Sequence, residues 1–219
     1  MGRFDTAIVI PAFNECKTIV AVIAMLRKYG DVIIVDDGSS DSTGQIAQET
    51  SATVLFHKSN LGYEVALSTG IEYAINKDYL YVITTDADGE LKSIGIEQIK
   101  EKLKQNNLIV VGNRDSKNRL IESFFGKLCF FAFGINDPLC GMKGYSTKFL
   151  KKYGFFDKNR MIGTEMLALA LRDDITIQEV PIDVKKRSGD SRFGGAFSSF
   201  LKITRVVFLF FRISLQKRV

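Results

Sequence analysis

Short apolar runs alternate along the first half of the chain with longer segments whose apolar residues recur at every third or fourth position. Such runs are typical of buried strands, and the longer spacing is typical of helices with one buried face. The runs at residues 6–10, 32–35, 53–56, 79–84 and 108–111 predict strands, and the segments at 19–29, 42–48, 65–74 and 93–104 predict helices. This alternation predicts an α/β fold with a mostly parallel sheet flanked by helices.

The pattern changes after residue 112. Polar residues at 113–122 are followed by helical spacing at 124–135, a short strand pattern at 142–145, a helix pattern at 165–171 and a strand pattern at 176–184. Residues 185–195 are basic and rich in glycine. Because no linker or repeat separates the two parts, we expect one domain over residues 1–195 with two halves, 1–112 and 113–195.

The last segment, residues 196–219, predicts an amphipathic helix. Its longest uncharged run, residues 206–211, is far short of the ~20 residues that cross a bilayer. We expect the helix to lie in the plane of a membrane interface; docking on the sheet or on another subunit is the alternative. The polar stripe holds Ser198, Lys202, Arg205, Arg212 and Gln216, with Leu209 as its only apolar member. The wide apolar face holds Phe197, Phe200, Ile203, Val207, Phe208, Phe210 and Phe211.

Three acidic residues, Asp86, Asp88 and Glu90, follow the predicted strand at 79–84. Carboxylates this close repel one another and rise in pKa unless a cation compensates them. Hard oxygen ligands of this kind suit Mg²⁺ or Mn²⁺, so we expect a metal-bridged diphosphate site. A solvated acidic turn that caps the next helix is the alternative.

Other acidic residues stand at the ends of the first two strands. They are Glu15, Asp36 and Asp37. Since ligands of open parallel sheets bind outside the carboxyl ends of the strands, we expect these side chains on the same edge as Asp86. Neither GxGxxG nor GxxxxGK[ST] occurs in the chain, so a phosphate-cradling glycine loop is excluded and the site depends on acids and metal.

Charged residues are distributed unevenly along the 219-residue chain. Residues 1–112 carry 10 Lys+Arg and 15 Asp+Glu, whereas residues 113–219 carry 20 and 10, and 14 of the 17 Phe follow residue 120. A basic, aromatic second half favours a surface for anionic amphiphiles such as lipid head groups over one built only to meet a soluble sugar. Nucleic-acid binding has little support, because the basic residues are interleaved with a Phe-rich apolar face. Basic residues that merely solubilise a Phe-rich core are the alternative.

Histidine and cysteine usage limits the chemistry and the compartment. The single His57 excludes a site with several histidines, and three cysteines without CxxC spacing argue against a disulfide framework. Because a polar N-terminus runs directly into a strand, we expect no signal peptide. We therefore expect a reducing, cytoplasmic location, peripheral at the cytoplasmic face of a membrane.

Motifs at successive strand ends carry a resemblance to a known family. They are residues 10–15 (IPAFNE), 35–39 (VDDGS), 60–62 (NLG) and 86–90 (DADGE), and the second half adds 112–114 (GNR), 140–144 (CGMKG) and 187–192 (RSGDSR). The chain resembles a family 2 glycosyltransferase of the GT-A fold, in the polyprenyl-phosphate branch typified by dolichyl-phosphate mannose synthase. The resemblance covers about residues 5–195.

The resemblance implies an inverting transfer of a sugar from a nucleoside diphosphate sugar, a GDP- or UDP-sugar, assisted by Mg²⁺ or Mn²⁺. It makes residues 1–112 the nucleotide-sugar-binding half and 113–195 the acceptor half. The implied nucleotide-sugar residues are Pro11, Phe13, Glu15, Asp36, Asp37, Gly62, Asp86 and Ala87; the implied metal residues are Asp86, Asp88 and Glu90; and Arg114, Arg187 and Arg192 would meet a phosphate. The family commonly has Tyr, Gln and Lys where Phe13, Glu90 and Arg192 stand.

Two acceptors are consistent with the sequence. A polyprenyl phosphate is already an anion at neutral pH and needs no general base. A sugar hydroxyl of a glycan or lipid-linked oligosaccharide would need a carboxylate base, for which Glu165 is the first candidate and Asp137 the second. A non-catalytic membrane-associated subunit is an alternative of another class. The sugar, the nucleobase and the oligomeric state do not follow from the sequence.

Overall fold

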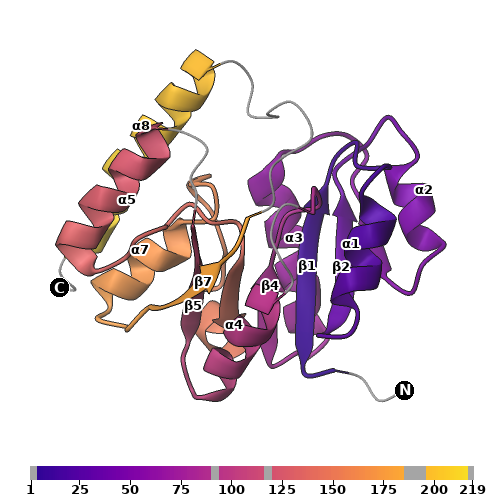
Figure 1. The fold of residues 1–219 in the computed structure, drawn as a ribbon, viewed down its shortest axis with the longest axis horizontal. Helices are drawn as coiled ribbons and strands as arrows, with labels where there is room; N and C mark the ends of the chain where they lie inside the picture. The colour runs from indigo at the N-terminus through magenta and orange to yellow at the C-terminus, as the bar shows by residue number, and fades with distance from the viewer. Residues whose placement is uncertain (1–3, 90–93, 116–119, 185–195, 217–219) are drawn as a thin grey trace.

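The computed structural model describes residues 4–89, 94–115, 120–184 and 196–216 (Figure 1). Its described strands form one seven-stranded sheet in the order β3-β2-β1-β4-β6-β5-β7. The strands are β1 (Thr6–Ala12), β2 (Asp31–Asp36), β3 (Thr53–Phe56), β4 (Tyr81–Thr84), β5 (Ile109–Arg114), β6 (Lys143–Ser146) and β7 (Gln178–Ile182). The predicted α/β class with a mostly parallel sheet is confirmed.

The helices alternate with the strands as predicted, with one addition. They are α1 (Ile19–Leu26), α2 (Thr43–Gln48), α3 (Tyr63–Asn76), α4 (Ile94–Lys104), α5 (Leu120–Phe133), α6 (Thr147–Tyr153), α7 (Glu165–Arg172) and α8 (Ala196–Ser214). Helix α6 is not among the predicted helices. Its ends are well defined: Ser146 Oγ accepts from Phe149 N at 3.2 Å, and Gly154 adopts a left-handed φ of 72°.

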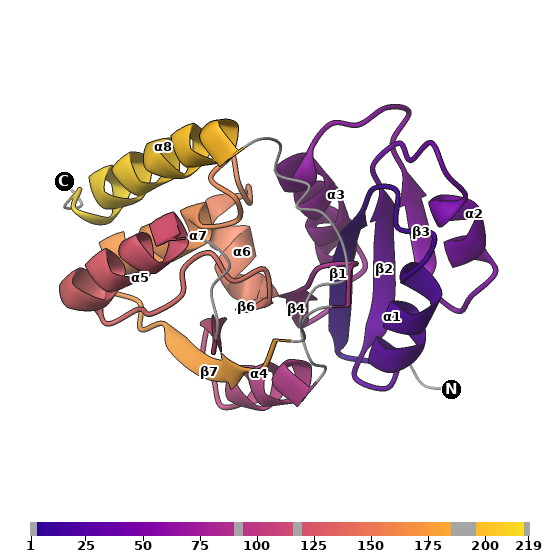
Figure 2. The same cartoon turned by 45° about the horizontal axis from the view of Figure 1, so that its top comes forward.

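Helices cover both faces of the sheet (Figure 2). Helices α1 and α4 share one face, where Lys100 Nζ of α4 donates to the carbonyl of Tyr29 beyond α1 at 2.7 Å. Helix α3 packs on β1 and β2 from the other face. The core between these layers is dominated by fully buried Ile and Val of the central strands.

Strand β6 runs antiparallel to both of its neighbours, β4 and β5. The sequence predicts a strand near this position but not its direction. Helix α4 crosses β6 so closely that a Cβ on Gly144 would lie 2.2 Å from Ile99 Cγ2. The reversal pairs Lys143 with Thr84, which brings the chain of residues 137–143 back to the carboxyl end of β4.

Helix α8 packs on helices α5 and α7 of the domain, whereas the alternative expected from the sequence was docking on the sheet or on another subunit. Ile203, Val206 and Phe210 are buried against α5 and α7, and the rings of Phe210 and Phe125 meet edge to face at 5.4 Å. Phe208, which the sequence places on the wide apolar face, is 66% exposed. The helix therefore buries a narrower stripe than expected and leaves other aromatic side chains on the surface. Among the described residues, no helix is both long and apolar enough to span a bilayer.

Candidate functional site

The acidic pair after β4 lies where the sequence predicts it, at the carboxyl edge of the sheet. Asp86 Oδ1 accepts from the hydroxyl of Tyr63 at 3.2 Å, and a Cβ on Gly141 would stand 2.3 Å from Asp86 Oδ2. Burial, followed by the negative charge of Asp88, raises the pKa of Asp86 to about 6. Asp86 thus lacks full compensation from its protein neighbours, a shortfall that a divalent cation would remove.

A metal at this edge would receive few ligands from the protein. Within the described ranges, no group of three His, Cys, Asp or Glu side chains is arranged to hold a metal ion. Asp86 and Asp88 remain as two candidate ligands, and Glu90 lies outside the described residues. Two carboxylates suit Mg²⁺ or Mn²⁺ that keeps water and substrate phosphates as its other ligands.

A buried lysine stands behind the acidic pair. Lys143 Nζ donates to the carbonyl of Cys140, and burial lowers the pKa of Lys143. The positive charges of Arg114 and Lys143 act on Asp86 in the opposite direction to Asp88. Thr84 Oγ1 donates to the carbonyl of Gly141 at 2.8 Å, so the segment at residues 140–143 is tied to the end of β4.

The loops after β1 and β2 are joined to each other. Ser40 N donates to Asn14 Oδ1 at 2.9 Å, and Asn14 N donates to Ser39 Oγ at 2.9 Å. Asp36 Oδ1 accepts from Ser39 N at 3.1 Å, while Glu15 Oε2 accepts from Thr18 Oγ1 at 2.8 Å. The structure therefore brings Glu15 and Asp36 to the same loop cluster.

Asp37 organises the start of α3. Its Oδ1 lies 2.7 Å from His57 Nδ1 and accepts from Leu61 N at 2.9 Å, and its Oδ2 accepts from Gly62 N at 2.8 Å. Gly62 itself has a φ of 100°, a backbone conformation that residues other than glycine rarely adopt. Both oxygens of Asp37 are thus used to hold the turn at residues 60–62.

Arg114 is held in a buried ion cluster. Its Nε and Nη2 donate to the two oxygens of Asp137 at 2.7 and 3.0 Å, and Nη2 also contacts Glu122 Oε2 at 3.3 Å. Burial alone would lower the pKa of Arg114, but hydrogen bonding to Asp137 and the charges of Asp137 and Glu122 outweigh it and raise the pKa. Sequence reasoning misses Glu122, because only the fold brings the start of α5 to the end of β5.

The two candidate bases are both engaged. Asp137 is 1% exposed and receives the fork of Arg114. Glu165 is 2% exposed at the start of α7, and its oxygens accept from Asn159 N at 2.7 Å and from Asn159 Nδ2 at 2.6 Å. Neither carboxylate presents an exposed oxygen to a substrate hydroxyl.

Residues 157–163 form a tightly held loop before α7. Asp157 accepts from Met161 N at 2.8 Å and from Gly163 N at 2.7 Å. Burial, and then the charges of Glu165 and Glu64, raise the pKa of Asp157 to about 7 despite these two donors. Arg160 and Ile162 have left-handed φ values of 51° and 55°, so the loop is strained as well as anchored.

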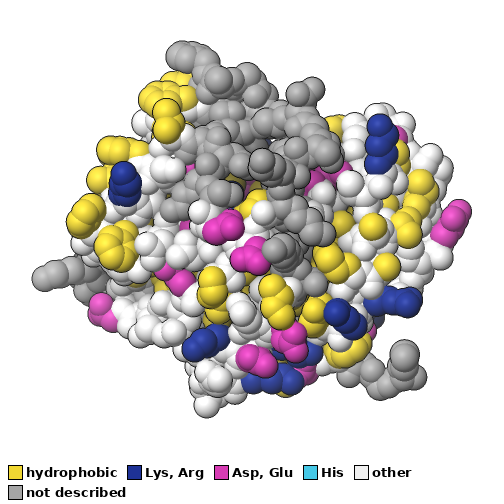
Figure 3. Space-filling view, in the orientation of Figure 1, with side chains coloured by type: hydrophobic (Ala, Val, Ile, Leu, Met, Phe, Trp, Pro, Cys, Tyr) yellow, Lys and Arg dark blue, Asp and Glu magenta, His cyan; other side chains and the backbone are white. Residues whose placement is uncertain are grey.

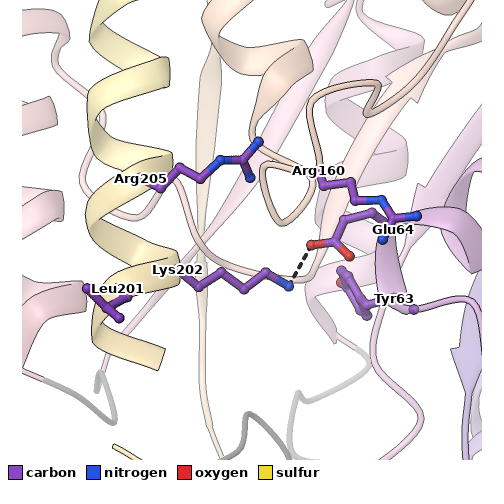
Figure 4. Close-up of a pocket in the computed structure, with 7 residues that line it drawn as sticks. Tyr63, Glu64, Arg160, Leu201, Lys202 and Arg205 are labelled. Atoms are coloured by element: carbon purple, nitrogen blue, oxygen red, sulfur yellow. Dashed lines mark ion pairs between the residues drawn. The ribbon is translucent and has the colours of Figure 1, made fainter. Parts of the chain in front are cut away.

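A pocket of about 510 Å³ opens between this loop, the start of α3 and the first turns of α8 (Figure 4). It is lined by Gly62, Tyr63, Glu64, Arg160, Leu201, Lys202 and Arg205. The sequence puts Lys202 and Arg205 on one helix stripe but gives no sign that Arg160 and Glu64 face them. Their proximity depends on the docking of α8.

A family model described as glycosyl transferase family 2 matches residues 7–169. The chain belongs to this family. It is a glycosyltransferase, as the strand-end motifs predict.

Relatives of this glycosyltransferase carry informative names. It is 27% identical to a dolichyl-phosphate hexose transferase of Haloferax volcanii, over 88% of this chain and 90% of that protein. It is 20% identical to a polyprenol monophosphomannose synthase of Mycolicibacterium smegmatis, over 87% of this chain and 82% of that protein. The predicted resemblance to the polyprenyl-phosphate branch is therefore confirmed.

Solved structures share the fold. A glucosyl-3-phosphoglycerate synthase from Mycobacterium tuberculosis, in complex with Mn²⁺ and UDP-glucose, superposes with a TM-score of 0.76 at 19% identity, covering 97% of this chain and 79% of that one. At this identity the similarity establishes the GT-A-like architecture alone.

The remaining predicted site residues of the glycosyltransferase divide into two groups. Pro11 and Phe13 are partly buried at the end of β1, and Ala87 is buried between the two acids. Arg187 and Arg192 lie outside the described residues, as Glu90 does.

Proposed function

We propose that this chain is an inverting glycosyltransferase that moves a sugar from a nucleoside diphosphate sugar, a GDP- or UDP-sugar, to a polyprenyl phosphate at a membrane surface. One observation carries the choice of acceptor: Asp137 and Glu165, the two carboxylates that could act as general base, are buried and hydrogen-bonded. An acceptor that is already an anion needs no base, whereas a sugar hydroxyl does. The names of the relatives from Haloferax volcanii and Mycolicibacterium smegmatis support the same acceptor class.

The donor would bind across the carboxyl edge of the sheet. Residues 1–112 supply this half of the site, with the nucleoside beside Pro11, Phe13 and the acidic loops. Asp86 and Asp88 would hold Mg²⁺ or Mn²⁺ together with the diphosphate, and the raised pKa of Asp86 supports a cation there. When bound, the metal would neutralise the charge that develops on the departing diphosphate.

The acceptor half would then need only to position a phosphate oxygen. The lipid phosphate attacks the anomeric carbon from the face opposite the diphosphate, so a single displacement inverts that carbon. Asp88→Ala is expected to remove turnover while leaving the fold intact, because Asp88 is not part of the core.

A patch of exposed apolar residues supports a location at the membrane surface. Figure 3 shows several separate exposed hydrophobic side chains along the edge formed by α5 and α8. The exposed members are Leu120, Phe124, Phe130 and Phe131 of α5 and Phe200, Leu201, Phe208 and Leu215 at α8. We propose that this patch, rather than the whole of α8, meets the cytoplasmic face of the membrane.

The experiment is incubation of the full chain with a polyprenyl phosphate, Mg²⁺ or Mn²⁺, and a panel of labelled GDP- and UDP-sugars. The expected product is a labelled lipid that extracts into organic solvent, formed by the wild type and not by Asp88→Ala. Equal circular dichroism spectra of the two proteins provide the folding control. Labelled glycan without labelled lipid, with any donor, would refute the proposed acceptor.

A further inference from the structure

The pocket beside α3 has an unusual balance of charge. Arg160, Lys202 and Arg205 bring three positive charges to it, and Glu64 brings one negative charge. The buried cluster at Arg114 is different, since two carboxylates already surround that guanidinium. Among the described residues that line this pocket, cations therefore exceed anions, so an added anion would meet a net positive charge.

The cations of the pocket are held by separate contacts. Lys202 Nζ lies 2.8 Å from Glu64 Oε1, the ion pair drawn in Figure 4. Arg205 Nη2 donates to the carbonyl of Asn159 at 3.2 Å, and Asn159 is in turn fixed by Glu165. A guanidinium has five N–H donors, so this single bond leaves Arg205 most of its hydrogen-bonding capacity.

Arg160 reaches the pocket from the strained loop. Its left-handed φ of 51° is maintained by the two backbone hydrogen bonds that Asp157 accepts on either side of Ile162. Such strain persists only where surrounding contacts impose it. The loop thus fixes the backbone that carries Arg160 at the lining of the pocket.

The pocket adjoins the predicted donor site. Tyr63 lines the pocket, and its hydroxyl donates to Asp86 Oδ1. An anion held by the three cations would therefore be separated from the acidic pair by one side chain. A phosphate in this pocket would lie next to the donor site without occupying it, as the acceptor of the sugar must.

An apolar residue completes the lining. Leu201 adjoins Lys202 on α8, lines the pocket and is 53% exposed, and Phe200 beside it is 52% exposed. Cations next to exposed apolar side chains on the same helical turn match a ligand with an anionic head and an apolar chain. A free phosphate or a nucleotide would use the cations but not the apolar wall.

We propose that this pocket binds the phosphate of the lipid acceptor, with Arg160, Lys202 and Arg205 as its ligands. This assignment rests on the proposed function and adds an acceptor subsite to it. Arginine suits the role because its planar fork matches two phosphate oxygens. Helix α8 would then contribute to two functions. Its exposed apolar residues would contact the membrane surface, and Lys202 and Arg205 would bind the acceptor phosphate.

The test compares Arg160→Gln and Arg205→Gln with the wild type, using a short-chain, water-soluble prenyl phosphate so that membrane attraction does not enter. Each variant is expected to raise KM for the prenyl phosphate by about tenfold, the loss of one charge-assisted hydrogen bond. The KM for the sugar donor should stay unchanged. Both residues are exposed, so circular dichroism should show native folding.

Arg212→Gln is the matched control. It removes one positive charge from an exposed position of α8, the helix that carries Arg205, outside the pocket lining, and should leave both KM values unchanged. An active wild type with an unaltered acceptor KM in both pocket variants would overturn the subsite and leave the proposed function standing. A raised donor KM would also overturn it by assigning the cations to the donor. A wild type that glycosylates no prenyl phosphate would refute the proposed function itself.

Discussion

Removing the positive charge of Arg114 tests whether the guanidinium is chiefly a structural partner of Asp137. Arg114→Met keeps much of the side-chain volume but leaves Asp137, which is 1% exposed, without its bidentate partner at 2.7 and 3.0 Å. Breaking a buried ion pair from one side typically costs about 3–5 kcal/mol. We expect a loss of that order in the free energy of unfolding at neutral pH.

The double variant Arg114→Met/Asp137→Leu separates the charge effect from the packing effect. It removes both charges together, so no buried carboxylate remains at position 137 without a partner. Glu122 still loses its weaker contact with Arg114 at 3.3 Å. We expect it to recover more than half of the lost stability, since apolar replacement of a buried pair is often nearly neutral.

Urea unfolding followed by circular dichroism is the suitable assay, because the chain contains no Trp for fluorescence. The wild type and both variants are compared at equal ionic strength, and their midpoints and slopes are fitted separately. A loss below about 1 kcal/mol in Arg114→Met, the size of an exposed pair, would refute the structural role of Arg114. Additive losses in the double variant would do the same.

Three further outcomes are expected. Chelation of divalent cations should abolish transfer, and added Mn²⁺ or Mg²⁺ should restore it; full activity in excess chelator would contradict the metal assignment. Gly141→Ala should reduce turnover at least tenfold, because its Cβ would stand 2.3 Å from Asp86 Oδ2 and displace that carboxylate, which a shifted Mn²⁺ titration would detect. The pKa of Asp157 is raised from 3.8 to about 7, so the folded state binds its proton more tightly and the wild type should lose stability as pH rises from 4 to 7. In Asp157→Asn this pH dependence should be absent. The difference in the free energy of unfolding between pH 4 and pH 7, measured by denaturation at both pH values, should therefore be about 1–3 kcal/mol smaller than in the wild type. The same pH dependence in both proteins would contradict the titration of a buried Asp157.

The sequence by itself determined most of the elements and the acidic edge. Strand runs such as residues 6–10 and 32–35 are local patterns, and parallel neighbours end at one edge, so the order of the motifs after β1, β2 and β4 is enough to place them together. The family followed from the same motifs. These features depend on the order of residues along short segments, which the sequence states directly.

The tertiary structure decided which charged groups meet. Arg114 and Asp137 are 23 residues apart, and Arg205 and Asn159 are 46 apart, so no periodic pattern signals either contact. The reversed β6 and the docking of α8 bring them together. An isolated arginine in a sequence therefore suggests a phosphate ligand equally well at Arg114 and at Arg205. Only the fold shows that carboxylates neutralise the first, whereas the second faces a pocket with an excess of positive charge, because ion pairing depends on distances between segments that packing alone sets.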